Sequence, residues 1–317
     1  MSFKITGTGK GIPKKVVSND DLSAFLDTDD EWITTRTGIK TRRVCTDESL
    51  AELSQTAAQS AMKKAGLKPG DIDLIICSTI NGDYVTPSLA CVVQRRIGAL
   101  CPAFDVNAAC SGFIYALDIA ALYLEQNKAQ NILIVCAEMM SRHVDWTDRR
   151  TCVLFGDGAG ACVVSKGTAL KYIKLVAEGD DKPIYLESGS GNSPFSEKKK
   201  QGFMHMLGND VYKFAVGMVE REVKAALAAL DMTPGDIDYF VLHQANKRII
   251  DTARTKLKQP AEKFPLNIQD YGNISSATIP ILLDEMTEQG RIKTGDTLFL
   301  NAFGAGMTAG SCVLVWE

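Results

Sequence analysis

Cys110 is the residue of this sequence whose position best suits covalent chemistry. The segment 103–112 predicts a short strand that leads directly into a helix, and Cys110 lies at the first turn of that helix. Unpaired backbone N–H groups and the positive end of the helix dipole favour the thiolate there, which is the nucleophilic form of cysteine. The alternative is that Cys110 is a small core residue, one of nine cysteines.

A histidine is the usual proton acceptor for such a thiol, and the sequence has three of them. His143 lies in a polar segment and His205 lies between methionines. His243 directly follows the apolar segment 239–242, a predicted strand, and precedes a predicted helix. The ends of strands in α/β sheets are frequent catalytic positions. His243 is therefore the candidate partner of the thiol, and a structural role at the strand end is the alternative.

Two further segments have turn chemistry that can present polar groups. Asn273 follows Tyr271 and Gly272, which predicts a tight turn that delivers an amide side chain; a helix cap is the alternative. The glycine-containing segment 301–308 follows a predicted strand. Its backbone N–H groups suit an oxyanion hole, and a simple hairpin turn is the alternative.

The hydrophobic pattern indicates which elements must position these residues. Helical periodicity is found near residues 50–65, 111–126, 211–230, 245–257 and 276–289. Strand patterns are found near residues 73–79, 103–108, 131–137, 152–164, 238–243, 296–302 and 311–316. The alternation predicts an α/β protein with a largely parallel sheet covered by helices. The region 180–205, rich in Gly, Ser, Asp and Lys, is expected to be an excursion from it.

The sequence repeats itself weakly. Pro-Gly-Asp-Ile-Asp occurs at 69–73 and again at 234–238, each time between a predicted helix and a predicted strand. A second weak repeat pairs the segment around Cys162 with the segment around Cys312. Chance recurrence of common turn residues is one explanation. The shared context favours a duplication that gives two similar halves.

Composition excludes several classes of function. The chain has 317 residues, 45% of them hydrophobic and 23% charged, with a net charge of −3, which argues against nucleic-acid binding. Neither a signal peptide nor a membrane span is predicted. The cysteines are scattered without CxxC pairs, which predicts reduced thiols and a cytoplasmic location. The three separated histidines argue against a metal site.

Three segments together resemble a known family: 108–113 with Cys110, 243–246 with His243, and 271–273 with Asn273. They are similar to the Cys–His–Asn triad of β-ketoacyl-acyl-carrier-protein synthase III, in the thiolase-like superfamily. The resemblance covers essentially the whole chain and includes three further segments, 27–39, 147–160 and 208–213. It implies a homodimer with a five-layered αβαβα fold of two duplicated halves. Residues 1–170 would form the half with the cysteine, and residues 171–317 the half with the histidine and asparagine.

The resemblance implies a two-stage Claisen condensation. An acyl group moves from coenzyme A to Cys110, and malonyl-acyl carrier protein then decarboxylates and attacks the thioester. Backbone N–H groups of Cys110 and Ala305 would form the oxyanion hole. His243 and Asn273 would donate hydrogen bonds to the enolate oxygen. Acyl-CoA is a substrate here, and neither a cofactor nor a metal ion is expected.

Binding residues are carried over from the family in the same way. Trp32 would stack on the adenine beside Arg149, and Arg36 would lie near the phosphates. The remaining expected coenzyme A contacts are Thr28, Met206, Asn209, Asn246 and Phe303. A basic patch for an acidic carrier protein is expected from Lys213, Lys247, Arg248, Arg254 and Lys256.

The sequence departs from the family pattern in four places. Thr86 stands where acetyl-selective members often have a phenylalanine that reaches across the dimer interface, so a longer acyl pocket is expected. Ala305 replaces a glycine, which limits backbone freedom, and Ala309 replaces a tryptophan. Arg150 beside Arg149 is also unusual.

Three functions are therefore in competition. The first is the condensing enzyme that initiates fatty-acid synthesis. The second is a related acyltransferase, or a condensing enzyme of a specialised-metabolite pathway that uses a longer primer. The third is a non-catalytic partner that binds coenzyme A. Intact His243 and Asn273 favour decarboxylative condensation over simple acyl transfer, which does not need both. The presence of Cys110 argues against the non-catalytic partner.

Overall fold

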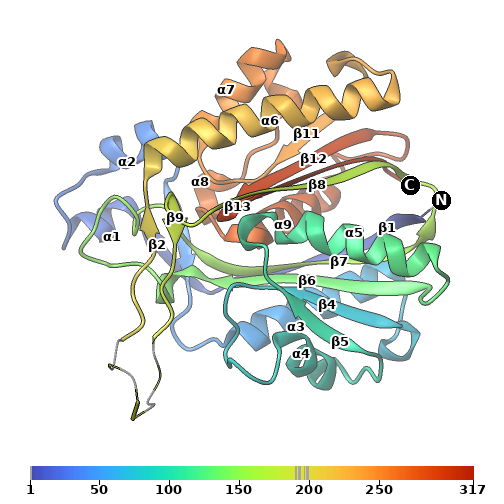
Figure 1. The fold of residues 1–317 in the computed structure, drawn as a ribbon, viewed down its shortest axis with the longest axis horizontal. Helices are drawn as coiled ribbons and strands as arrows, with labels where there is room; N and C mark the ends of the chain where they lie inside the picture. Colours follow the sequence, from blue (N-terminus) through green and yellow to red (C-terminus); the bar gives the residue numbers. More distant parts are fainter. Residues whose placement is uncertain (1, 190, 192–193, 196, 198–199) are drawn as a thin grey trace.

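The computed structural model describes residues 2–189, 191, 194–195, 197 and 200–317. Figure 1 shows two stacked β-sheets with helices between them and on both outer faces. The helices are α1 (Asn19–Ser23), α2 (Asp30–Thr37), α3 (Leu50–Ala65), α4 (Leu89–Ile97), α5 (Gly112–Glu125), α6 (Gly208–Leu230), α7 (Lys247–Leu257), α8 (Ile268–Tyr271) and α9 (Thr278–Glu288).

The first sheet has five strands in the order β1-β7-β6-β4-β5. Its central strand β6 runs parallel to β4 and antiparallel to β7, and β5 pairs parallel to β4 at the edge. Residues of β4 are all buried, as expected for a strand covered on both faces. The bounds are β1 (Ser2–Gly11), β4 (Leu74–Ser78), β5 (Ala103–Val106), β6 (Asn131–Met139) and β7 (Asp157–Gly167).

The second sheet has four strands in the order β11-β12-β13-β8. Here β11 and β12 are parallel, whereas β13 is antiparallel to both of its neighbours. The bounds are β8 (Leu170–Asp180), β11 (Tyr239–Leu242), β12 (Thr297–Gly304) and β13 (Gly306–Val315). Two short ribbons, β2 (Lys15–Ser18) with β3 (Thr41–Val44) and β9 (Ile184–Tyr185) with β10 (His205–Met206), lie outside the two sheets.

The layers follow from the alternation of side chains along the strands. On β12, Leu298 and Leu300 face a core that also contains residues of α5 and α9, whereas Phe299 and Phe303 face the core under α6 and α7. Helices α3 and α4 cover the outer face of the first sheet. The result is the predicted five alternating layers, with α5 and α9 in the middle (Figure 1). Helix α5 is apolar almost all round because it lies between two sheets.

The repeated sequence signals occupy matching places in the two sheets. Both Pro-Gly-Asp segments form a 3-10 turn before a parallel strand, β4 in one sheet and β11 in the other. Cys162 on β7 pairs with Ile134 on β6, and Cys312 on β13 pairs with Leu300 on β12. The repeated segments lie at equivalent positions in the two sheets, in the same order along the chain, which supports the predicted duplication into two similar halves. Strand β7 ends at Gly167 and β8 begins at Leu170; the division of domains at residue 170 stays a prediction.

Several features differ from the sequence expectations. The predicted largely parallel sheet is wrong: the two sheets are mixed, because β1, β7, β8 and β13 pair antiparallel with their neighbours. The short elements α1, α2, α8, β2, β3, β9 and β10 were not predicted. The strand expected from residue 152 begins at Asp157, because residues 151–154 form turns that lead into the site. Helix α4 and strand β8 were not predicted, since α4 is short and β8 is largely half-exposed with lysines among its apolar residues. Within the described residues, no helix is both long enough and apolar enough to cross a membrane.

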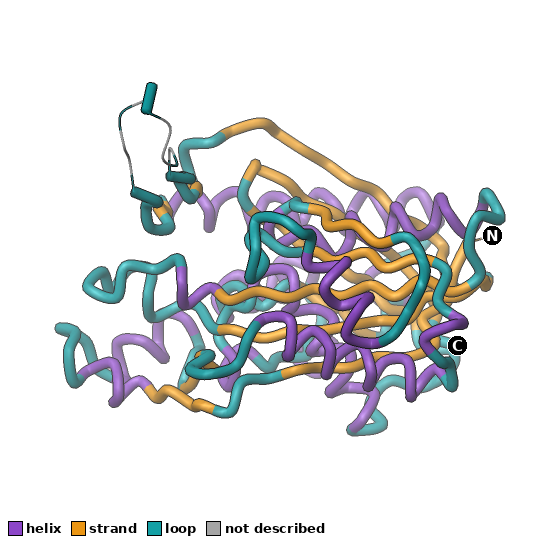
Figure 2. The backbone as a smooth tube through the Cα atoms, turned by 90° about the horizontal axis from the view of Figure 1, so that it is seen from below, coloured by secondary structure: helices purple, strands orange, loops and turns teal. Residues whose placement is uncertain are grey.

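Both termini lie at one end of the molecule in the two views (Figures 1 and 2), where Lys4 Nζ is 3.5 Å from Glu317 Oε2. The short helices α1 and α2 lie at the opposite end (Figure 1). The parallel strands β4 and β11 run toward that end, so the residues that follow them gather there.

Candidate active site

Cys110 lies in a 3-10 turn, Ala109–Ser111, that leads from β5 into α5. Ala109 has a positive φ of 47°, a conformation that costs energy for a residue with a side chain. The Ser111 and Thr308 hydroxyl groups are 2.7 Å apart and fasten the turn to β13. A Cβ on Gly112 would lie 1.9 Å from Ser78 Oγ and 3.1 Å from Ser78 Cβ, so a larger residue there would force the Ser78 side chain to move. These contacts fix the cysteine in a sharp turn.

His243 follows β11 directly and is 1% exposed. Its backbone N–H donates to the Asn301 carbonyl at 2.8 Å, and its ring Nδ1 lies 2.6 Å from Thr278 Oγ1. Phe303 contacts the ring edge-on, with the ring centroids 5.4 Å apart. Burial lowers the pKa of His243 to about 3, so the imidazole is neutral at physiological pH.

Asn273 is held by its backbone and by one end of its side chain. Its N–H donates to the Leu154 carbonyl at 2.8 Å, and its carbonyl accepts from Gly156 N–H at 3.1 Å. Its side-chain Oδ1 accepts from Ser275 N–H at 2.8 Å. Because the oxygen is engaged, the amide NH₂ is the end left for a ligand. A turn is present before Asn273, with Gly272 at a φ of 69°, but the bond to Ser275 N–H also fits the capping alternative, so the catalytic role of the amide stays a prediction.

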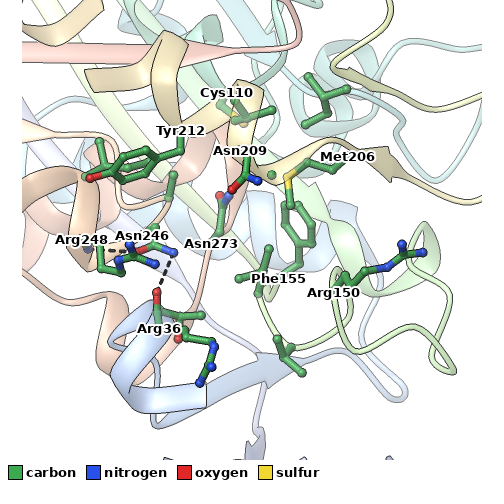
Figure 3. Close-up of a pocket in the computed structure, with 18 of the residues that line it drawn as sticks. Arg36, Cys110, Arg150, Phe155, Met206, Asn209, Tyr212, Asn246, Arg248 and Asn273 are labelled. Atoms are coloured by element: carbon green, nitrogen blue, oxygen red, sulfur yellow. Dashed lines mark hydrogen bonds between the residues drawn. The ribbon is translucent and has the colours of Figure 1, made fainter. Parts of the chain in front are cut away.

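Cys110, His243 and Asn273 line one pocket of about 280 Å³. Figure 3 shows Cys110 on one side of the pocket residues, Asn273 near their centre, and Arg36 and Arg150 on the opposite side. Residues far apart in the chain are thus brought together, because the strand ends of both sheets meet here.

The protonation of Cys110 differs from the sequence expectation. Burial raises the pKa of the Cys110 thiol to about 12, although a hydrogen bond with Ser275 acts in the opposite direction. The position at a helix start predicted a lowered pKa instead. Loss of hydration of the thiolate is the largest of the causes. The resting cysteine is therefore a neutral thiol.

The segment 301–308 is a hairpin rather than a flexible loop. Strands β12 and β13 pair up to Gly304 and Thr308, and Ala305 lies at the turn. A Cβ on Gly304 would lie 2.7 Å from the Cys110 backbone nitrogen, so the hairpin approaches the cysteine at a glycine. Gly304 lines the pocket; Ala305 is its neighbour, and the Ala305 carbonyl accepts from Thr308 Oγ1 at 3.0 Å. The oxyanion role of the Ala305 N–H stays a prediction.

Most of the predicted coenzyme A contacts line the same pocket. They are Trp32, Arg36, Arg149, Met206, Asn209, Asn246 and Phe303. Four arginines are among the lining residues: Arg36, Arg149, Arg150 and Arg248. The guanidinium groups of Arg36 and Arg149 lie 4.6 and 5.1 Å from the centre of the Trp32 indole. This clustered positive charge contrasts with the negative net charge of the chain.

Two of these polar groups are already bonded within the protein. Asn246 caps α7 by accepting from Arg248 N–H at 2.9 Å, and its NH₂ donates to the Arg36 carbonyl at 3.1 Å (Figure 3). Arg149 Nη1 pairs with the Asp27 carboxylate at 3.2 Å. Asn246 therefore joins α2 to α7 at the pocket, which is the capping role that its sequence position also permits.

Of the other predicted residues, the docking residue Arg248 lines this pocket, and the rest lie outside its described lining. Thr28 is partly buried, and its hydroxyl oxygen has no hydrogen-bond partner. Thr86 is exposed to solvent in the single chain. The docking lysines lie on α6 and α7: Lys247 pairs with Asp251 at 2.5 Å and Lys256 with Glu220 at 2.6 Å. Lys213 is exposed and Arg254 is partly exposed.

Sequence reasoning missed a buried polar group under the site. Glu138, 2% exposed, accepts from the hydroxyls of Ser275 and Ser276 at 3.1 Å each and from Ile80 N–H at 3.0 Å. Burial raises its pKa to about 7. The available signal was a lone carboxylate at the end of the otherwise apolar strand 131–139. Thr278, beside His243, carried no comparable signal.

The chain was compared with known protein families. Residues 104–180 match the family model of 3-oxoacyl-[acyl-carrier-protein] synthase III, and residues 227–316 match that of its C-terminal region. A β-ketoacyl-[acyl-carrier-protein] synthase III of Clostridium acetobutylicum is 44% identical over 321 residues, which cover 99% of each chain. The chain belongs to the β-ketoacyl-acyl-carrier-protein synthase III family. It is a condensing enzyme of the acyltransferase class, as the resemblance implied.

Solved structures of this family share the fold. The synthase III of Aquifex aeolicus is 42% identical with a TM-score of 0.92 over 99% of this chain and all of that one. A priming β-ketosynthase of a polyketide pathway is 32% identical with a TM-score of 0.94, covering 100% of this chain and 96% of that one. These likenesses confirm the predicted thiolase-like fold.

Proposed function

We propose that this chain transfers an acyl group from acyl-CoA to Cys110 and condenses it with malonyl-acyl carrier protein, the reaction that initiates fatty-acid synthesis. The observation that carries the proposal is one pocket whose lining includes Cys110, His243 and Asn273 together with four arginines. Arginines match the phosphates of coenzyme A, and a narrow pocket suits its long thioester arm.

In the first stage, Cys110 Sγ attacks the thioester carbonyl carbon. The proton of the thiol passes to the free ring nitrogen of neutral His243 and then to the sulfur of coenzyme A as its C–S bond breaks. Backbone N–H groups at the Cys110 turn stabilise the oxyanion. No stable ion pair is needed beforehand, because both groups are neutral at rest.

In the second stage, the malonyl group loses CO₂ and its C–C electron pair becomes an enolate. The Asn273 NH₂ and a ring N–H of His243 donate to the enolate oxygen. An amide suits this position because a carboxylate would repel the negative charge. The enolate carbon attacks the acyl carbon on Cys110, the C–S bond breaks, and the thiolate takes a proton from solvent. The chemistry uses side chains and backbone N–H groups, so we propose that it needs no cofactor.

The experiment is intact-protein mass spectrometry after incubation with acyl-CoAs from acetyl to dodecanoyl. We expect an acyl adduct on the native chain and none on Cys110→Ala. Cys312→Ala, which removes a buried cysteine in the opposite sheet, serves as the matched control and should still load. The absence of an adduct with every donor would contradict the proposal and favour a non-catalytic binding role.

A second candidate, a priming enzyme for a longer acyl chain, is favoured by Thr86 and by the likeness to a priming β-ketosynthase. Loading by long acyl-CoAs in preference to acetyl-CoA would support it over fatty-acid initiation.

We propose a homodimer through the open edge of the first sheet. Among the described strands, β5 pairs only with β4, so its other edge is unpaired. Val85 and Leu100 nearby are each 96% exposed, and Tyr84 is 60% exposed. Thr86 lies in this exposed segment, so a second copy would cover it.

We further propose that the basic side chains of α6 and α7 bind the acidic carrier protein. We also propose that the enzyme acts in the cytoplasm, where its free cysteines stay reduced.

A further inference from the structure

Thr278, the first residue of α9, is 3% exposed and faces the ring of His243. Its Oγ1 lies 2.6 Å from Nδ1, and within the described residues this hydroxyl is the hydrogen-bond partner of that nitrogen. Phe303 contacts the ring edge-on. The orientation of the imidazole therefore depends on one hydroxyl group and one aromatic contact.

The hydrogen of the Thr278 hydroxyl can point toward either of two acceptors, the Ser275 carbonyl or His243 Nδ1. Thr278 Oγ1 donates to the Ser275 carbonyl at 3.2 Å and accepts from Gln244 N–H at 3.4 Å. The same Ser275 carbonyl also accepts a backbone N–H, that of Thr278 itself. If the hydroxyl turns from Ser275 toward His243 Nδ1, the carbonyl keeps a donor. Neither orientation leaves a buried polar group without a partner.

The two orientations match the two neutral tautomers of histidine. When the hydroxyl donates to Ser275, its oxygen accepts from Nδ1–H, and the other ring nitrogen, Nε2, has a free lone pair. When the hydroxyl donates to Nδ1, Nε2 carries the hydrogen. A hydroxyl can be donor or acceptor, whereas a carboxylate is only an acceptor and an N–H only a donor.

We propose that Thr278 is the positioning residue for His243 and holds the ring in the same place in either tautomer. This rests on the proposed function, in which Nε2 accepts a proton during acyl transfer and donates a hydrogen bond during decarboxylation. Between the two arrangements the ring gives up its Nδ1 proton and takes up a proton on Nε2 by exchange with solvent, and within the protein only the Thr278 hydroxyl group rotates. Thr278 contacts the ring nitrogen that faces away from substrate, so it acts through His243.

The test compares Thr278→Val, which keeps the shape but removes the hydroxyl, with Thr278→Ser, which keeps the hydroxyl. Thr287→Val is the matched control, because Thr287 lies on the same helix and its hydroxyl donates to the Leu283 carbonyl away from the site. Two rates are measured for the full-length chain: acylation of Cys110 by acyl-CoA, and CO₂ release from malonyl-acyl carrier protein by the acyl-enzyme. Nitrogen-15 spectra of histidine-labelled protein report the tautomer, and three histidines keep them simple.

We expect Thr278→Val to slow both rates by about ten- to a hundredfold, as for loss of a buried hydrogen-bond partner, and to shift the Nδ1 resonance of His243. Thr278→Ser should retain both rates and the native resonance, and Thr287→Val should resemble the native protein. Unchanged rates in Thr278→Val would overturn the inference. Slow rates in Thr278→Ser together with an unshifted His243 Nδ1 resonance would also overturn it, because they would indicate that Thr278 contributes only packing. If the native chain fails to load any acyl group, the proposed function itself fails.

Discussion

The two side chains that exchange a proton in the proposed reaction are both neutral at rest. Burial raises the pKa of Cys110 to about 12 and lowers that of His243 to about 3, in each case because water no longer solvates the charged form. A neutral pair resists adventitious oxidation and alkylation, since the thiolate is the reactive species. The nucleophile is then generated as substrate binds and the proton moves.

The raised pKa of Cys110 predicts how fast the free enzyme reacts with iodoacetamide. The thiolate fraction rises with pH until the pKa is reached, so the rate should increase about tenfold for each pH unit between 7 and 9. The rate is measured from the mass of the Cys110-containing peptide, with Cys110→Ala as the blank. A plateau of the reaction rate below pH 8 would show that the helix start lowers the pKa of Cys110 more than burial raises it.

Glu138 predicts a pH dependence of stability. Its pKa in the folded chain, about 7, lies above its ordinary value of 4.5, so the folded state binds more protons between these values. The free energy of unfolding should therefore fall as pH rises from about 4.5 to 7, by up to about 3 kcal/mol. Glu138→Gln should lose this component in urea titrations at pH 5 and 8. Identical pH dependence in both proteins would contradict the assignment.

At the scale of elements, the site depends on how closely the β12–β13 hairpin approaches the start of α5. Gly304 is the contact point: a Cβ there would lie 2.7 Å from Cys110 N and 3.1 Å from Cys110 Cβ. The Ser111–Thr308 hydroxyl pair holds the same two elements together, and the close approach of Gly112 to Ser78 sets the start of α5 against β4. The nucleophile is thus positioned by backbone packing and only then by its neighbouring side chains.

Gly304→Ala should displace the Cys110 turn. We expect acyl loading to slow at least about tenfold, with a destabilisation of about 1–3 kcal/mol from overpacking. Gly179→Ala on β8 is the control, because a Cβ there meets no atom within 4 Å. Acylation rates and thermal melting of both variants are the measurements. If Gly304→Ala is acylated at the native rate, the hairpin shifts to accommodate the added methyl group without displacing Cys110, and the prediction is wrong.

At the scale of the whole molecule, one buried carboxylate ties the two halves together. Asp284 on α9 is fully buried and lies 2.6 Å from Lys64 on α3 and 3.0 Å from Lys10 on β1. Thr8 Oγ1 also donates to it at 2.9 Å. Glu288, one turn later, pairs with the same two lysines, but its side chain is 48% exposed.

This difference in burial predicts different costs for two similar substitutions. Asp284→Asn should lower the free energy of unfolding by about 3 kcal/mol, because it breaks a buried ion pair. Glu288→Gln should cost less than about 1 kcal/mol, as expected for a solvent-screened pair. Urea denaturation of both variants measures the difference. Equal costs would show that burial does not control this network.

Much of the site could be predicted from local sequence. Cys110 at a strand-to-helix turn, His243 at a strand end and Asn273 in a Tyr-Gly-Asn turn each carry a local signal, and all three line the pocket. Thr278 and Glu138 could not be predicted as site residues. Thr278 comes next to His243 only when α9 packs beneath β11, and Glu138 meets Ser275 only when β6 lies under the Asn273 turn.

The sequence by itself determined the α/β class, the main core helices and strands, the duplication and the residue types able to perform a condensation. Hydrophobic periodicity and turn residues are local properties of the chain, so they can be recognised in the sequence alone. Tertiary structure alone decided the protonation of those residues and which backbone approaches the cysteine. Desolvation and steric fit depend on atoms from distant segments. Burial raises the pKa of Cys110, and Gly304, which is 194 positions further along the chain, packs against the backbone nitrogen of Cys110.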